Sequence, residues 1–428
     1  MRLNILTSKD KTIRSNCGVY VVEELIRNKG LKSFLLNCFP SRANQAHYND
    51  ADLVLGLTYG ILCGAEYLED LNEVKRELDC EYVKIPSSDT IGYRIGQLSV
   101  EDEQPKNPRS EVVHQFNCNT FLNETLARLG AWLNPEWKRS PVTVDYDNTI
   151  IPTGKDSEAT YKKVCGYQPG VGIIDNQPVY VEGRNGNSTS SFKMEETLQR
   201  MVHQLEGAGI RVGALRIDAA AFSQNVFKWL YKRPDLKYYL GARKQNIDIL
   251  RDAKWDTFTW GEVKVQATSI EYPGPGMNEL PDHGCRLVVY RQKKKGGQQD
   301  LFWGAYQYRF ILTNDWQMTA RQVVEYYNQR GAAERVFEYL KYDFNWLNMP
   351  FGQMNTNTAY LLITAMSYQI YQWVLKKIRY FQGVASTIRP KKFNLYFINV
   401  TGKWIRTGRT KYLKLYSSRP YQELFQSG

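Results

Sequence analysis

The pattern of apolar residues changes at Pro141, from a helical repeat to short alternating strands. Between Gly18 and about Leu98, apolar residues recur three and four positions apart, which predicts helices. After Pro141, three strands precede a helix, a strand and a second helix, an order typical of an α/β domain in which an antiparallel start joins a parallel strand. These elements are expected at residues 142–147, 163–174, 178–183, 194–205, 211–218 and 225–231.

Later segments show further boundaries. From Trp255 to about Thr313 the sequence is again typical of strands, with a basic turn at 292–299. Thr319, followed three residues later by Gln322, predicts a capping box at the start of a long helical stretch. The segment 101–109 is charged, contains two prolines and no apolar residue, and so indicates an exposed linker.

The charge is unevenly distributed. The chain has 56 Lys and Arg against 44 Asp and Glu, and the formal net charge of +12 predicts a polyanionic partner. Twelve cations lie between Asp343 and Glu423, where the sequence has no Asp or Glu. Interleaved aromatic residues such as Phe393 suit this segment to phosphate contact with base stacking, although a solvated basic surface has the same composition. The candidate DNA contacts are Lys391, Lys392, Arg406, Arg409 and Lys411.

Other features narrow the partner and the compartment. Polar residues interrupt the longest apolar run, 358–375, at the spacing of a buried helix, so we expect no membrane span and nucleic acid as the partner. The seven cysteines are scattered singly, which favours neither a disulfide framework nor a zinc module. The N-terminus carries charges where an export signal has an apolar core. We therefore expect a cytoplasmic protein.

Three acidic residues occur where strands are expected to end. Alternation along 142–147 puts Asp145 and Asp147 on the same face of a strand. Asp218 closes the strand 211–218, at the carboxyl end where α/β sheets place ligand-binding groups. Each of these residues alone is also typical of a turn or a helix cap.

A further group of four polar residues is expected on one face of a helix. Steps of three, four and seven residues would keep Tyr327, Arg330, Glu334 and Lys341 together. A solvated, salt-bridged surface has the same pattern. Apolar residues on the neighbouring face need burial, however, so the polar face is predicted to line a cleft.

The run YNQRGAAERVFEYLK at 327–341 has Tyr, two residues, Arg, three residues, Glu, six residues and Lys. It resembles the signature of DDE transposases encoded by bacterial insertion sequences. DNT at 147–149 resembles the family's Asp-x-Thr motif, LRIDAAAF at 215–222 resembles its second-Asp motif, and SSDTIGYRI at 87–95 resembles the segment before its catalytic domain. Ala219 and Ala220 stand where relatives often carry Ser and Gly, a departure that affects no catalytic group.

The resemblance implies an α/β fold with an RNase H-like catalytic domain, an inserted β subdomain and a preceding, mostly helical DNA-binding domain. It also implies that Asp147, Asp218 and Glu334 hold two Mg²⁺ or Mn²⁺ ions, for which carboxylate oxygens are suitable ligands. The expected domains are a helical DNA-recognition domain at 1–100, a linker at 101–110, the catalytic domain at 111–242 and 317–380, the β insertion at 243–316, and a basic region at 381–428.

The chemistry expected from this resemblance is hydrolysis at the element ends and transfer of the freed 3′-hydroxyl to target DNA. Arg330 and Lys341 would bind phosphate, and Tyr327 would position or stack on the DNA. The partners would be terminal inverted repeats and target DNA, both double-stranded, bound by at least a homodimer on paired ends in the bacterial cytoplasm, at the nucleoid. A structure-specific nuclease without strand transfer, and a non-catalytic DNA-binding protein derived from a transposase, are the alternatives.

The two carboxylates of strand 142–147 compete for the role of metal ligand. Same-face residues on a strand lie about 6.5–7 Å apart, too far for both to bridge one metal pair. The Asp-x-Thr pattern assigns the metal to Asp147, and Asp145 then holds a neighbouring cation or water. The alternative makes Asp145 the ligand and Asp147 a turn residue.

Overall fold

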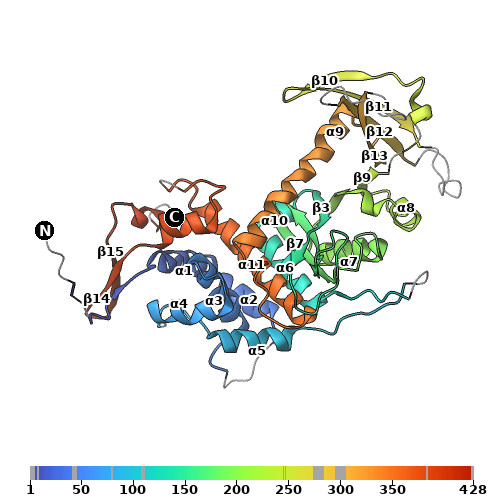
Figure 1. Cartoon of the computed structure of the whole chain (residues 1–428). Helices are drawn as coiled ribbons and strands as arrows, with labels where there is room; N and C mark the ends of the chain where they lie inside the picture. The colour runs from blue at the N-terminus through green and yellow to red at the C-terminus, as the bar shows by residue number, and fades with distance from the viewer. Residues whose placement is uncertain are drawn as a thin grey trace. The chain divides into compact units, whose positions relative to one another are not determined.

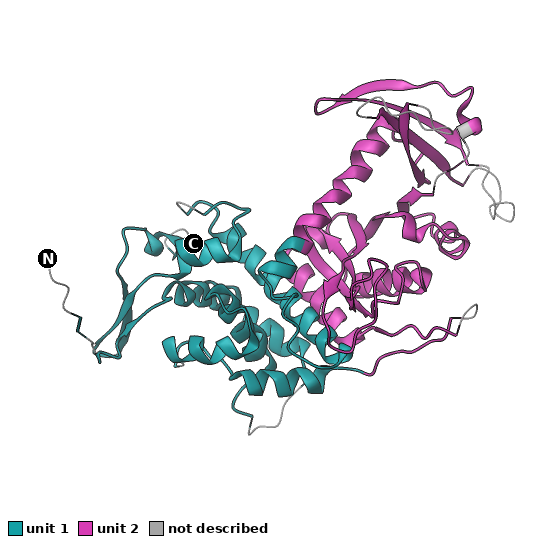
Figure 2. Ribbon diagram, in the orientation of Figure 1, with its two compact units in different colours: residues 1–100, 338–428 teal, residues 101–337 magenta. Residues whose placement is uncertain are grey.

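The computed structural model describes residues 5–6, 9–40, 46–78, 81–107, 111–243, 245, 247–272, 284–294, 305–381 and 384–425. It divides into two compact units (Figure 2). Unit 1 contains Met1–Val100 and Glu338–Gly428, and unit 2 contains Glu101–Phe337. Most of the expected basic turn at 292–299 lies outside the described residues.

Unit 1 is mostly helical, and local sequence explains its breaks. Gly30 has a φ of 76° and separates the first two helices, because this left-handed conformation is favourable for glycine. The helices are α1 (Gly18–Lys29), α2 (Leu31–Cys38), α3 (Asp50–Leu62), α4 (Leu71–Glu77), α5 (Ser88–Leu98), α11 (Met354–Lys377) and α12 (Pro390–Phe393).

Although the described residues between 18 and 98 form mainly helices, as expected, a separate helical N-terminal domain is not evident. Every residue of α3 is buried, and a helix that is buried all round needs partners on all sides. The C-terminal part of the chain supplies some of them. Thr58 of α3 donates a hydrogen bond of 2.9 Å to the hydroxyl of Ser367 in α11, and Asn394 donates one of 2.8 Å to the carbonyl of Leu62.

The long helix α11 is buried over most of its length, which confirms the prediction of a buried helix at 358–375. Several of its buried hydroxyl groups donate to carbonyls of the same helix: Thr364, for example, donates to the carbonyl of Tyr360. Among the described residues, no helix has the length and apolar character that crossing a membrane requires.

Several aromatic residues of the C-terminal segment form a core. Phe393 and Phe397 are fully buried, and their rings stack with centroids 5.0 Å apart. Tyr421 and Phe381 pack against Phe397 with centroid distances of 5.1 and 5.0 Å. The expectation that the segment's aromatic residues serve base stacking is therefore wrong for these phenylalanines, because packing has removed them from the surface.

Unit 2 is built on one large mixed sheet, so the mixed α/β class is confirmed (Figure 1). Strand β8 is parallel to both β3 and β9, whereas the other neighbouring strands are antiparallel. In spatial order the strands are β10 (Asp256–Trp260), β11 (Val263–Glu271), β12 (Arg286–Lys293), β13 (Tyr306–Thr313), β9 (Lys237–Ala242), β8 (Val212–Ile217), β3 (Val142–Asn148), β6 (Gly170–Ile174), β7 (Gln177–Arg184) and β2 (Phe116–Asn117). A small separate pair is β4 (Ile151–Pro152) with β5 (Gly166–Tyr167).

Helices cover both faces of this sheet. Val144 and Tyr146 of β3 belong to a core with residues of α6 (Thr120–Leu133), α7 (Met194–Gly207) and α8 (Gln224–Tyr231). On the other face, α9 (Ala320–Asn328) packs on strands β11 and β12. Asp145 and Asp147 alternate with the core residues of β3, so they project to the face that carries α9.

The boundaries of the two compact units differ from the boundaries of the expected domains. Strands at 256–313, expected as an inserted subdomain, continue the same sheet, because β13 pairs with β9. Residues 101–107 of the expected linker belong to unit 2, where Glu103 and Lys106 pair with Phe116 and Val113. The ranges themselves stay predictions.

The helical stretch after Thr319 is interrupted. Its start is confirmed, because Thr319 and Gln322 form the predicted capping box. A 3₁₀ turn at Gln329–Gly331 then separates α9 from α10 (Ala332–Tyr342). The helix expected to carry Tyr327, Arg330, Glu334 and Lys341 is therefore not one continuous α-helix.

A buried charge cluster fixes β7 to α7. Glu182 is fully buried and accepts hydrogen bonds of 2.9 Å from both Arg184 and Arg200. Tyr180 also donates to it, at 2.8 Å. Burial would raise the pKa of Glu182, but the two arginines outweigh that effect and lower it to about 2.

We predict that Glu182→Gln lowers the free energy of unfolding by about 3–5 kcal/mol at neutral pH, because it leaves buried cations uncompensated. The stabilisation by Glu182 is present above its unfolded pKa of about 4.3. It is lost as the pH falls toward the folded pKa of about 2, so the difference between parent and variant should narrow over that range.

Denaturant unfolding at several pH values measures this effect. Glu124→Gln, at an exposed position of α6, is the matched control and should change little. Equal stability of parent and Glu182→Gln at neutral pH would contradict the prediction.

Candidate active site

Two carboxylates lie at one edge of the central sheet. In the parallel pair β3–β8, Asp145 is the register partner of Arg216, and Tyr146 is the partner of Ile217. Asp147 and Asp218 each follow the last of these pairs, so the two acids occupy corresponding positions at the carboxyl ends of neighbouring strands. This is where α/β sheets place ligand-binding groups.

Local backbone contacts orient both acids. One carboxylate oxygen of Asp218 accepts a hydrogen bond of 2.9 Å from the backbone N–H of Ala220, and Asp218 caps the short turn Ala219–Ala221. Asp147 accepts one of 2.9 Å from the N–H of Asn148. Asp218 is therefore a capping residue, and its place beside Asp147 is compatible with a second role.

Asp147 is influenced by the charges of both Arg330 and Asp218. Burial raises the pKa of Asp147, Arg330 opposes this shift, and the negative charge of Asp218 adds to it. The Arg330 guanidinium forms an ion pair of 2.7 Å with Asp147, and both side chains are 23% exposed. The site thus combines two neighbouring carboxylates with one partly accessible cation.

Tyr327 links the end of α9 to the strand that carries Asp218. Its hydroxyl donates a hydrogen bond of 3.2 Å to the carbonyl of Ile217, and burial raises its pKa to about 12. Gly241 of β9 permits this approach. A β-carbon there would lie 2.7 Å from the Tyr327 hydroxyl and 2.9 Å from the backbone nitrogen of Ala219.

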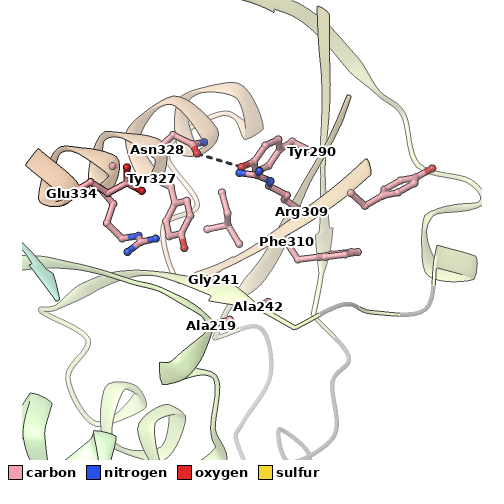
Figure 3. Close-up of a pocket in the computed structure, with 13 residues that line it drawn as sticks. Ala219, Gly241, Ala242, Tyr290, Arg309, Phe310, Tyr327, Asn328 and Glu334 are labelled. Atoms are coloured by element: carbon pink, nitrogen blue, oxygen red, sulfur yellow. Dashed lines mark hydrogen bonds between the residues drawn. The ribbon is translucent and has the colours of Figure 1, made fainter. Parts of the chain in front are cut away.

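Glu334 borders a pocket of about 350 Å³ together with Tyr327 and Arg330 (Figure 3). It lies in the first turn of α10 and is exposed. Strands β12 and β13 supply the opposite wall, where the Tyr290 hydroxyl donates a hydrogen bond of 3.3 Å to Asn328. The 3₁₀ turn therefore leaves Tyr327, Arg330 and Glu334 around one pocket, although not on one continuous helix.

Asp145 has a different environment from Asp147. Both of its oxygens accept hydrogen bonds from Arg216, at 2.6 and 2.8 Å, and each of these side chains is only 10% exposed. Burial raises the pKa of Asp145, and Arg216 opposes the shift. The carboxylate of Asp145 is thus occupied by an arginine.

Arg216 also holds the end of α9. It donates hydrogen bonds of 2.8 Å to the carbonyl of Tyr326 and 3.2 Å to the side chain of Gln329. Its guanidinium lies 4.8 Å from the centre of the Tyr326 ring. Sequence reasoning missed Arg216; the available signal was an arginine two residues before Asp218 in an otherwise apolar strand.

The sequence-predicted set is only partly assembled. Asp147, Asp218, Tyr327 and Arg330 come together, and Glu334 shares a pocket with the last two. Among the described residues, no group of three or more His, Cys, Asp or Glu side chains is arranged closely enough to hold a metal ion. Lys341 lies beyond Phe337 in unit 1, so its role at the site stays a prediction.

More cations of the C-terminal segment are paired with acidic residues than the sequence indicates. Acids distant in sequence reach four of them. Lys391 pairs with Glu66 at 2.6 Å, and Lys411 lies 3.5 Å from Glu81. The other pairs are Arg389 with Asp343 and Glu338, and Lys403 with Asp10. Among the candidate DNA contacts, Lys392, Arg406 and Arg409 form no ion pair with a described residue.

Comparisons with known proteins match this chain to solved structures and to one family model. A cryo-EM structure of the piggyBac transposase synaptic complex with hairpin DNA is similar to this chain at 12% sequence identity, covering 89% of this chain and 78% of that chain, with a TM-score of 0.39. No curated protein sequence matches the chain. The model of the family described as "Transposase DDE domain group 1" matches residues 5–428. Because this match includes both strand-end aspartates, Glu334 and nearly every other residue, the chain belongs to the DDE transposase domain family, group 1.

Proposed function

We propose that this protein is a DNA transposase that hydrolyses phosphodiesters at the ends of a bacterial insertion sequence and joins the 3′-hydroxyl to target DNA. The observation that carries the proposal is the pair Asp147 and Asp218 at the ends of parallel strands, with Arg330 beside them. Family membership supports the same reaction class. An RNase H-like core is part of the proposal, supported by the antiparallel order β7-β6-β3 followed by parallel β8 and β9.

Asp147, Asp218 and Glu334 would hold the divalent ions. Carboxylate oxygens are the hard donors that Mg²⁺ and Mn²⁺ prefer, so the chemistry of the donor set fits. When bound, two such ions would activate the attacking hydroxyl and stabilise the leaving oxygen. Arg330 occupies one oxygen of Asp147, so metal binding through that oxygen requires this ion pair to open. Once released, the guanidinium is available to a DNA phosphate.

The proposed ligands are terminal inverted repeats and target DNA, bound by a homodimer on paired ends in the bacterial cytoplasm. Accessible cations on the C-terminal segment, such as Lys392 and Arg406, suit contact with phosphates. A nuclease without strand transfer would use the same acids. A joining assay with a labelled 3′-end separates these two activities.

We predict that Asp218→Asn and Glu334→Gln each abolish metal-dependent cleavage while leaving DNA affinity nearly unchanged, because each removes a ligand charge and little volume. Cleavage of end DNA in Mg²⁺ and binding of the same DNA without metal are the two measurements. Glu325→Gln, on α9 in an ion pair with Arg321, is the matched control and should cut at the parental rate. Cleavage near the parental rate by either site variant would refute the assignment.

A second comparison separates the two acids of β3. Asp147→Asn should eliminate cleavage, whereas Asp145→Asn should reduce it by about 10–100-fold, because Asp145 acts by holding Arg216 and the end of α9. Asp145→Asn should also lower the unfolding midpoint, because it leaves Arg216 without its buried partner. Thermal unfolding and cleavage rates of the two variants, measured side by side, test this assignment. If Asp145→Asn were inactive and Asp147→Asn active, Asp145 and not Asp147 would be the metal ligand.

A further inference from the structure

The hairpin formed by β14 (Gly402–Thr407) and β15 (Thr410–Leu415) extends past its neighbouring strand (Figure 1). Strand β1 (Ile13–Arg14) pairs with Gly402 and Lys403. Residues 405–412, which we call the arm, lie beyond this pairing, and every one of them is exposed. Gly408, the first of the two turn residues, has a φ of 60°, the pattern of a type II′ turn.

The base of the arm is firmly attached to unit 1. The Trp404 ring packs on Tyr20 and Tyr82, with centroid distances of 5.0 and 5.5 Å. The backbone N–H of Trp404 donates a hydrogen bond of 2.9 Å to the carbonyl of Thr12. These contacts attach the base of the hairpin to unit 1, and the arm beyond it is exposed.

Like charges face each other across the hairpin. Arg406 is directly opposite Lys411, and Lys403 is directly opposite Lys414. Such cross-strand pairs are destabilising. Asp10 and Glu81 offset the charges of Lys403 and Lys411 respectively, and within the described part of the chain Arg406, Arg409 and Lys414 form no ion pair. This arrangement is explained if a polyanion supplies the missing negative charge.

The two faces of the arm differ in chemistry. Alternation places Arg406 and Lys411 on the face that continues from Trp404. The opposite face carries hydroxyl and apolar groups: Ile405, Thr407, Thr410 and Tyr412. A two-stranded ribbon fits the major groove of B-DNA, about 12 Å wide, where hydroxyls bond base edges and apolar groups contact the thymine methyl.

We propose that the arm enters the major groove of duplex DNA. Arg406 and Arg409 would contact the flanking phosphates, while Thr407, Thr410 and Tyr412 face the base edges. This inference rests on the proposed function in taking DNA as the ligand, but it does not depend on cleavage.

The phosphate contacts are tested by the salt dependence of binding of the full-length protein to a short mixed-sequence duplex. Arg406→Gln combined with Arg409→Gln should flatten the log–log slope by roughly 2, at about 0.9 per lost contact. Arg76→Gln combined with Lys84→Gln removes the same charge from exposed positions elsewhere in unit 1 and should change the slope much less. An unchanged slope in the arm variant, or an equal change in the control, would overturn the phosphate contacts.

The groove is tested with the same duplex premethylated at guanine N7, an atom of the major groove. The parent should bind methylated DNA more weakly than unmethylated DNA, and Thr407→Ala combined with Thr410→Ala should reduce that difference without changing the salt slope. A small molecule that fills the minor groove of the duplex should change the affinity of the parent protein for DNA very little. Insertion in the major groove would be overturned if the minor-groove ligand weakened DNA binding by the parent protein and N7 methylation did not.

Failure of the arm proposal and failure of the proposed transposase function would give different results. If the parent cuts DNA with Mg²⁺ and the arm variants bind as the parent does, the arm proposal alone is wrong. If the parent shows the salt and methylation effects but no metal-dependent cleavage, the arm proposal stands and the transposase activity is wrong.

Discussion

The ion pair between Asp145 and Arg216 is the interaction on which the geometry of the candidate site depends. It joins two parallel strands at the residues just before the strand-end acids, and Arg216 extends it to the end of α9. A buried guanidinium is favourable only where its donors are satisfied, and here a bidentate carboxylate, a backbone carbonyl and an amide oxygen accept from it. The pair thereby fixes the point at which the helix breaks and Arg330 faces Asp147.

The break between α9 and α10 explains how residues from different elements reach one pocket. Tyr327 ends α9 against Ile217, Arg330 lies in the 3₁₀ turn, and Glu334 begins α10. The close passage of β9 at Gly241 leaves space for this arrangement. Because β13 pairs with β9, the strands that line the far wall of the pocket are held by the same sheet as the acids.

Much of this architecture was predictable from local patterns. Alternation along β3 placed Asp145 and Asp147 on one face, and the end of an apolar strand located Asp218. Gly331 was a local sign of the 3₁₀ turn, but a single glycine is tolerated within a helix and does not by itself predict a break. The hydrogen bonds of Arg216 to Tyr326 and Gln329, which accompany the break, are tertiary contacts that local sequence does not show. The pairing of Lys391 with Glu66 and of Lys411 with Glu81 was also missed, since it joins residues more than three hundred positions apart. The roles of individual site residues remain predictions.

The central claim is that Asp147 and Asp218 belong to one divalent-metal site that forms when Arg330 leaves Asp147. Counting Mn²⁺ ions bound by the protein–DNA complex, by paramagnetic resonance, tests it most directly. We expect about two ions for each cleavage-competent chain, fewer ions in Asp147→Asn and Asp218→Asn, and the parental number in Glu325→Gln. Mn²⁺ binding that is the same in the parent and in both aspartate variants would contradict it.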